Sequence, residues 1–165
     1  MNLQIPQYTK RVVLVSNVSQ PPPFTFEQGD LIVEMNRAVH HTTLLNVLEN
    51  APVNKFLFIR HNKDGHFFPE NFCEKSNTWD CVVMSSERFG FSSEKWFEKY
   101  YNTTSGKTPT TGYALYKYFR SRRPKMEIIG LGFNLDDHST PHSAMHDWQY
   151  EYNQYAKDKL FKAIS

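Results

Sequence analysis

Residues 108–151, TPTTGYALYKYFRSRRPKMEIIGLGFNLDDHSTPHSAMHDWQYE, predict how the rest of the chain is organised. They contain, in order, a helix start, an apolar strand, a loop with three histidines and a second helix start. Thr110 and Thr111 precede Gly112 and a helical pattern, and threonine is a favourable N-cap because its side-chain oxygen accepts from the first amides of a helix. Those amides and the positive end of the helix dipole suit an anionic group. The segment therefore predicts a nucleotide-phosphate site with histidine side chains beside it.

Three histidines follow the predicted strand 127–133 within nine residues: His138, His142 and His146. Histidine transfers protons near neutral pH, so we expect acid–base chemistry here. A second helix start is marked by Thr140-Pro141, and we expect a last helix from about residue 141 to about 163. On that helix His142 and His146 would share one face, a spacing that also suits a metal ion, with His138 or Asp147 as a third ligand. A small metalloprotein is therefore one alternative interpretation.

The remainder of the chain alternates apolar runs with helical patterns. The runs expected to form strands are residues 10–16, 31–35, 55–60 and 80–85, and the patterns expected to form helices are residues 42–50, 93–101 and 111–122. Such alternation predicts an α/β fold with a mainly parallel twisted sheet flanked by helices. Ligands of these folds collect at the carboxyl ends of the strands. Asn17 and Asn36 follow the first two strands, so each is a candidate ligand-binding residue at the same edge.

Composition limits the class of protein. The 165 residues suffice for a single domain, 1–165, and 39% hydrophobic and 15% aromatic residues are typical of an ordered globular protein. A formal net charge of +2 gives no support for broad electrostatic binding to nucleic acid or to an anionic membrane. We interpret the basic run at residues 120–125 as the solvated end of a helix. No signal peptide and no apolar run of roughly 20 residues occurs, so we expect a cytoplasmic protein without a transmembrane segment.

Three pieces of the sequence, taken in order, resemble the sialyltransferases of glycosyltransferase family 29. KRVVLVSN (residues 10–17) followed by GDLIVEMNRA (residues 29–38) is similar to the long donor-binding motif of that family. TPTTGYALYKYF followed by EIIGLGFN is similar to its small motif. HDWQYE, residues 146–151, has the His-x4-Glu spacing of its last motif. Together the pieces cover most of residues 10–151.

The resemblance implies a single Rossmann-like domain that transfers sialic acid or a related acidic sugar from a CMP-activated donor to a glycan acceptor hydroxyl. It implies no metal ion and no cofactor besides the donor substrate. Carried over by position, the residues that would contact the donor are Asn17, Asn36, Thr110, Thr111 and Gly112. His146 would be the general base, His138 or His142 would face the phosphate, and Glu151 would set the electrostatics of the local helix. A non-catalytic nucleotide-binding or interaction module on the same fold is the second alternative, because the chain is short for this family.

Overall fold

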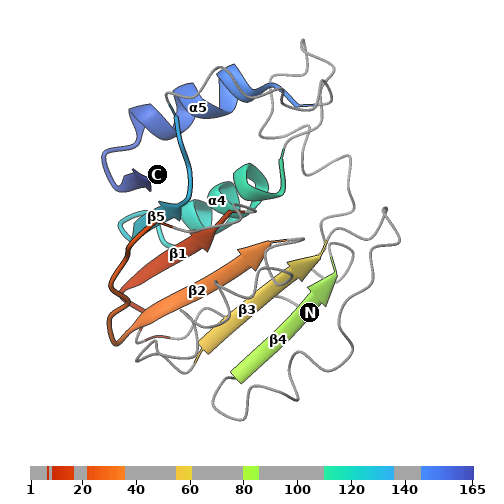
Figure 1. Cartoon of the computed structure of the whole chain (residues 1–165), viewed down its shortest axis with the longest axis vertical. Coiled ribbons are helices and arrows are strands. Elements are labelled where there is room, and N and C mark those ends of the chain that lie inside the picture. Colours follow the sequence, from red (N-terminus) through yellow and green to blue (C-terminus); the bar gives the residue numbers. More distant parts are fainter. Residues whose placement is uncertain are drawn as a thin grey trace.

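The structure, a computed structural model, describes residues 7, 9–16, 22–35, 55–60, 80–85, 110–135 and 146–165. Within these residues the chain forms one six-stranded sheet and two helices (Figure 1). The strands are β1 (Arg11–Val15), β2 (Asp30–Met35), β3 (Lys55–Arg60), β4 (Asp80–Ser85), β5 (Glu127–Leu131) and β6 (Phe161–Ile164). The helices are α4 (Thr111–Arg122) and α5 (Trp148–Lys157). For β3 and β4 only the backbone is described.

The strands lie in the order β4-β3-β2-β1-β5-β6, and every neighbouring pair is parallel. The predicted α/β class with a parallel sheet is thus confirmed. From β1 the chain continues to β2, β3 and β4, which extend the sheet on one side of β1. It then returns to β5 and β6, which extend the sheet on the other side of β1. The direction of winding therefore reverses between β1 and β5, and ligands of open α/β sheets bind at the carboxyl ends of strands at such a point.

Apolar residues cover both faces of the central strands. Residues 12–15 of β1 are all buried with 0% exposure, although successive side chains point to opposite faces. A strand buried on both faces has a nearly continuous apolar sequence, which is why RVVLV and EIIGL predict these strands correctly. The Cα partners Val12–Leu31 and Val12–Ile128 set the register of the three central strands.

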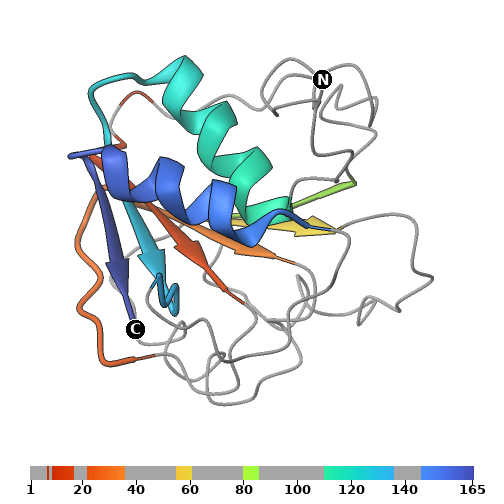
Figure 2. The same cartoon turned by 90° about the horizontal axis from the view of Figure 1, so that it is seen from above.

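Both helices pack on one face of the sheet (Figure 2). Val12, Leu14 and Ile128 on that face pack in one hydrophobic cluster with residues of α4, and Tyr155 of α5 and Phe161 of β6 belong to the same cluster. The rings of Tyr155 and Phe161 are stacked, with centroids 4.5 Å apart. Gly130 makes room for this aromatic layer, because a Cβ at that position would lie 2.6 Å from Phe161 and 2.7 Å from Phe133. The layer fixes α5 and β6 against β5.

The far ends of α4 and α5 are joined through Asp158, the C-cap residue of α5. Its Oδ2 accepts hydrogen bonds from Arg120 Nε and from Tyr116 Oη, both at 2.8 Å, and these donors lie on α4. Its Oδ1 accepts from the amide of Leu160 at 2.9 Å, which shapes the turn into β6. Burial raises the pKa of Asp158, but these hydrogen bonds and the charge of Arg120 outweigh it and the pKa is lowered overall.

Two predicted boundaries are wrong, and both errors have a local cause. The last helix does not extend from residue 141 to 163: His146 and Asp147 are not helical, α5 ends at Lys157, and residues 161–164 form β6. Asp147 begins the helix as its N-cap, accepting from the amide of Tyr150, and Asp158 ends it in an extended conformation. Strand β5 ends at Leu131 rather than at Phe133 because Gly132 turns the chain with φ 80°. The predicted helices 42–50 and 93–101 lie outside the described residues.

Candidate functional site

The start of α4 is capped as its sequence predicts. Thr110 has an extended backbone, and its Oγ1 accepts a hydrogen bond of 3.0 Å from the amide of Tyr113. The amide of Ala114 is bonded to the carbonyl of Thr110. By helix geometry, four amides at the start of α4 have no carbonyl partner within the helix. Those of Thr110 and Tyr113 bind side chains, which leaves the amides of Thr111 and Gly112. They are therefore the donors that α4 offers to an anion.

Glu151 of α5 joins the starts of the two helices. Its Oε1 accepts from the amide of Thr110 at 2.8 Å, and its Oε2 accepts from the Thr110 hydroxyl at 2.6 Å. The residue is only 1% exposed. A carboxylate is stabilised at a helix N-terminus because the dipole is positive there, and it costs several kcal/mol to bury without partners. This pair of bonds therefore holds the first turn of α4 against the first turn of α5.

The carboxylate fixes the direction of the Thr110 hydroxyl. Since that hydroxyl donates its one hydrogen to Glu151, it has none to donate to a bound phosphate. Thr110 was predicted to contact the donor, and that contact stays a prediction; in the structure its amide and hydroxyl bind Glu151, so it positions the turn carrying Thr111 and Gly112. This role is indirect, and a threonine followed by glycine at a helix start does not reveal it.

A layer of tyrosines lies directly beneath the junction. Tyr155 is 2% exposed, and its ring lies 5.8 Å from that of Tyr113 and 5.0 Å from that of Tyr116. Burial, followed by the charge of Glu151, raises the pKa of Tyr155 well above 10. Burial is also the main cause of the raised pKa of Tyr113. These phenols are neutral at physiological pH. Their rings therefore form an uncharged aromatic layer beside the carboxylate of Glu151.

The carboxyl ends of β1 and β5 are tied together at the point where the winding reverses. The Ser16 hydroxyl donates a hydrogen bond of 3.0 Å to the carbonyl of Gly132, and the Ser16 amide donates to the carbonyl of Leu131, also at 3.0 Å. Parallel strands place their carboxyl ends at one edge, and a helix that leads into a parallel strand begins at that same edge. The starts of α4 and α5 therefore lie at this edge of the sheet (Figure 1). The Ser16–Gly132 contact lies at the same edge.

His146 lies at the same edge, immediately before the N-cap Asp147. Its ring is 5.5 Å from that of Trp148 in an edge-on arrangement. At 1.5 Å per helical residue, Glu151 is about 6 Å along α5 from Asp147, so His146 lies within about two turns of the Thr110–Glu151 contact. The helix start that carries His146 is thus held against the start of α4, as the order of the motifs predicts.

The structure brings together some of the predicted site residues and leaves others untested. Thr110 and Glu151 are in direct contact, and Thr111 and Gly112 form the first turn of α4. The remaining predicted residues lie outside the described residues: Asn17, Asn36, His138 and His142. The first two directly follow Ser16 and Met35, at the carboxyl ends of β1 and β2, and their role stays a prediction.

The expected helical pairing of His142 with His146 is wrong. His146 precedes α5, and its backbone forms a bend rather than a helical turn. A spacing of four residues therefore does not place these two side chains on one helix face, and the metal interpretation loses its geometric basis. Across the described ranges there is no group of three or more histidine, cysteine, aspartate or glutamate side chains that could hold a metal ion.

Comparisons with known proteins give no relative from which a function could be transferred. No protein-family model matches the sequence, and no curated protein or solved structure shows significant similarity to it. Among the residues that the structure describes, neither helix is long and apolar enough to cross a membrane.

Two features of the site were missed from the sequence. Asp147 caps α5, and a signal for it was present, since aspartate followed by an aromatic helical segment is a common N-cap pattern. Ser16 was included only as the end of a strand. Its bond to Gly132 spans 116 residues, so no local pattern could have indicated it.

Proposed function

We propose that this protein is a glycosyltransferase that moves sialic acid or a related acidic sugar from a CMP-linked donor to a glycan hydroxyl. The proposal includes a single Rossmann-like domain over residues 1–165, a cytoplasmic location, and no metal ion in the reaction. Two features support it: the sequence resemblance to the sialyltransferases and the geometry at the carboxyl edge of the sheet.

One observation carries the proposal. The Thr-Thr-Gly helix start and the His-x4-Glu helix start are separated by about 40 residues, yet Glu151 of the second holds Thr110 of the first through two hydrogen bonds. Both motifs were singled out from sequence as parts of one active site, the first for the donor and the second for the base. A direct bond between them supports a common pocket, because it holds the two helix starts side by side.

The strand order also supports the proposed domain type. The order β4-β3-β2-β1-β5-β6 has one reversal of winding, beside β1, which is the arrangement by which Rossmann-like domains form a nucleotide crevice. The hydrogen bond from Ser16 to Gly132 joins the carboxyl ends of β1 and β5 at that edge. In the proposal, Asn17 and Asn36 contact the cytidine and ribose from the loops that follow β1 and β2.

In the proposed reaction, the acceptor oxygen attacks the anomeric carbon and the bond from that carbon to the CMP phosphate oxygen breaks. His146 takes the proton of the acceptor hydroxyl, and CMP leaves with the bonding electron pair as an anion. The amides of Thr111 and Gly112 donate to its phosphate, aided by the dipole of α4. Thr110 and Glu151 orient that turn, and His138 or His142 supplies the second phosphate contact.

Thermal unfolding in the presence of mononucleotides tests the binding step. CMP should raise the melting temperature, since a ligand that binds only the native state adds about 2.7 kcal/mol at a hundredfold excess over its Kd. UMP, AMP and GMP, measured alongside, should give smaller shifts. No shift with CMP at millimolar concentration, or an equal shift with all four, would contradict a cytidine site.

His146→Ala tests the chemical step. We expect this variant to keep the CMP-induced shift in melting temperature and to lose sugar transfer by about 100-fold or more, the typical contribution of a positioned base. Transfer that persisted at the wild-type rate would show that His146 is not the base. CMP binding by the wild type without turnover of any CMP-sugar would instead favour the non-catalytic nucleotide-binding module.

A further inference from the structure

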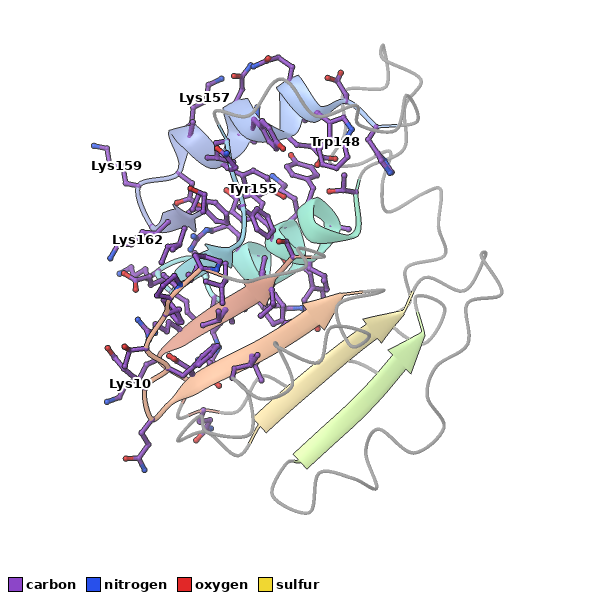
Figure 3. The ribbon with its side chains drawn as sticks, in the orientation of Figure 1. Lys10, Trp148, Tyr155, Lys157, Lys159 and Lys162 are labelled. Carbon is purple, nitrogen blue, oxygen red and sulfur yellow. The ribbon has the colours of Figure 1, made fainter. Side chains whose placement is uncertain are left out.

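Exposed basic side chains gather at the amino edge of the sheet, opposite the candidate site. We name this surface the basic edge, and it comprises Lys10, Arg122, Lys125, Lys157 and Lys159, all of them exposed. Figure 3 shows Lys10, Lys157 and Lys159 directed outward on the side of the molecule away from the strand arrowheads. A net charge of only +2 does not predict such a concentration, because the charge is distributed unevenly.

Backbone and side-chain contacts bring the separate segments of the basic edge together. The amide of Ile128 donates to the carbonyl of Leu160 at 2.9 Å, so the turn after α5 lies against the start of β5, which directly follows the turn after α4. Arg120 binds Asp158 across the same boundary. On the other side, Arg11 is the register partner of Glu127, which places Lys10 beside the chain that enters β5.

Among the side chains that the structure describes at this end, three of the acidic groups are bound by cations that do not belong to the basic edge. Asp158 is paired with Arg120, Asp30 with Arg11, and Glu127 with Lys162 at 2.7 Å. Glu27 is an exposed acid nearby, 3.8 Å from Arg11. Among the described side chains, the exposed charge of the edge is therefore mainly positive.

An exposed leucine lies within this basic surface. Leu160 is 39% exposed and follows Lys159 in the turn between α5 and β6. Its backbone is fixed at both ends, since its amide binds Asp158 and its carbonyl accepts from Ile128. A nucleic acid would neutralise the lysines but would leave Leu160 in water, whereas an anionic lipid surface attracts the lysines and accepts the leucine at its interface.

We propose that the basic edge docks the protein onto anionic lipid bilayers, with Leu160 entering the headgroup region. The carboxyl edge, with the starts of α4 and α5, then faces away from the membrane and stays open to water. The proposal rests on charge and exposure at the amino edge, so it stands or fails independently of the proposed transferase activity.

Vesicle sedimentation of the full chain tests the proposal. Vesicles of phosphatidylcholine with about 30% phosphatidylglycerol should bind the protein at about 50 mM NaCl and release it at about 500 mM, where exposed charges are screened within about 4 Å. Vesicles of phosphatidylcholine alone should not bind it. Absence of binding to the anionic vesicles at low salt would overturn the proposal.

Variants locate the surface. At about a fivefold loss for each lysine removed, Lys159→Gln should weaken vesicle binding about fivefold and Lys157→Gln/Lys159→Gln about 25-fold. Gln149→Glu is the matched control: it is exposed in the first turn of α5 and changes the charge by the same amount as Lys159→Gln. An equal loss in both single variants would mean that overall charge, and not the basic edge, governs binding. Circular dichroism verifies that each variant is folded.

The variant Leu160→Ser distinguishes binding to a lipid surface from binding to any polyanion. It keeps every charge, so vesicle binding should weaken about threefold or more while its salt dependence stays unchanged. A single-stranded oligonucleotide should compete poorly with the anionic vesicles. If the oligonucleotide displaces the protein completely and Leu160→Ser has no effect, the edge binds polyanions in general and the lipid proposal is wrong.

Discussion

At each end of the α4/α5 pair, one carboxylate from α5 or its C-cap binds α4 or its N-cap, but the groups that the two carboxylates bind differ. At the amino edge of the sheet Asp158 binds a guanidinium, Arg120, and a phenol, Tyr116. At the carboxyl edge Glu151 binds a backbone amide and a hydroxyl, both from Thr110. Asp158 therefore sets the distance between the helices through side chains, whereas Glu151 holds the backbone of the turn whose next amides face the candidate site.

This difference separates a structural contact from one that can support function. At the Asp158 end the carboxylate links side chains of α4 to the end of α5, and the main-chain donor that it binds is the amide of Leu160, at the opposite edge from the candidate site. A carboxylate bonded to the amide of an N-cap orients the whole first turn, since the following amides are rigidly related to it. The Glu151 end is accordingly where we expect substitutions to affect both stability and ligand binding, and the Asp158 end stability alone.

The largest expected effect is at the Glu151 end. Glu151→Ala leaves the amide and hydroxyl of Thr110 buried without their acceptor, so the free energy of unfolding should fall by about 3 kcal/mol. Urea unfolding followed by circular dichroism measures it. Thr110→Ala should cost about 1 to 2 kcal/mol through the lost cap, and Thr110→Ser should cost less because the hydroxyl is kept.

A double-mutant cycle decides whether the two residues act together. Because both bonds of Glu151 end on Thr110, the effects of Glu151→Ala and Thr110→Ala should be non-additive by about 1 kcal/mol or more. Effects that simply add would show that the cap and the carboxylate stabilise the protein independently.

At the Asp158 end, a smaller and acid-sensitive loss is expected. Asp158→Asn should lower the free energy of unfolding by about 1 to 2 kcal/mol at neutral pH, since it weakens bonds to a charged acceptor. The pKa of Asp158 is lowered in the folded protein, so its contribution is complete above about pH 4 and is lost as the pH falls through the lower folded value. The difference between wild type and Asp158→Asn, followed by urea unfolding, should shrink toward pH 2. A constant difference would mean that the charge of Asp158 is not what stabilises this end.

The tyrosine layer between the two ends gives the smallest effect at neutral pH. Burial raises the pKa of Tyr113, Tyr116 and Tyr155, so each keeps its proton in the folded state above pH 10 while the unfolded chain releases it. The contribution of these three tyrosines to the free energy of unfolding should therefore be constant below about pH 10 and should be lost as the pH rises further. Ultraviolet titration of the phenols should show these three ionising only as the protein unfolds. Reversible ionisation of all nine tyrosines near pH 10 in folded protein would contradict their burial.

The parts of the fold that sequence predicted are those with a strong local pattern. The continuous apolar runs RVVLV and EIIGL are typical of strands that are buried on both faces of a sheet. Thr110 followed by Gly112 marks the start of α4. The four-residue strand FKAI is too short and too mixed in polarity to be separated from a helix end. It becomes a strand because Asp158 ends α5 and Phe161 stacks on Tyr155, and both causes are visible only in three dimensions.

The candidate site divides in the same way. Helix caps and histidines are local signals, and these indicated Thr110, Thr111, Gly112 and His146 from sequence. Glu151 came from the resemblance alone, through the His-x4-Glu spacing. Glu151 accepts two hydrogen bonds from Thr110, which lies 41 residues earlier in the chain, and this contact depends on the packing of α4 against α5. Because the sequence does not show that packing, Thr110 was assigned to the ligand instead. The sequence thus indicated the residues, but it did not indicate which of them contact one another across the fold.

The most direct test of the central claim, that Glu151 aims the first turn of α4 at the phosphate of CMP, is a nitrogen-15 amide spectrum of the folded protein titrated with CMP. We predict that the amide signals of Thr111 and Gly112 shift with saturation, and that Glu151→Gln weakens this binding by about tenfold, equivalent to the loss of one modest hydrogen bond. If CMP leaves both amides unmoved while the protein stays folded, or if Glu151→Gln binds CMP as tightly as the wild type, the account is contradicted.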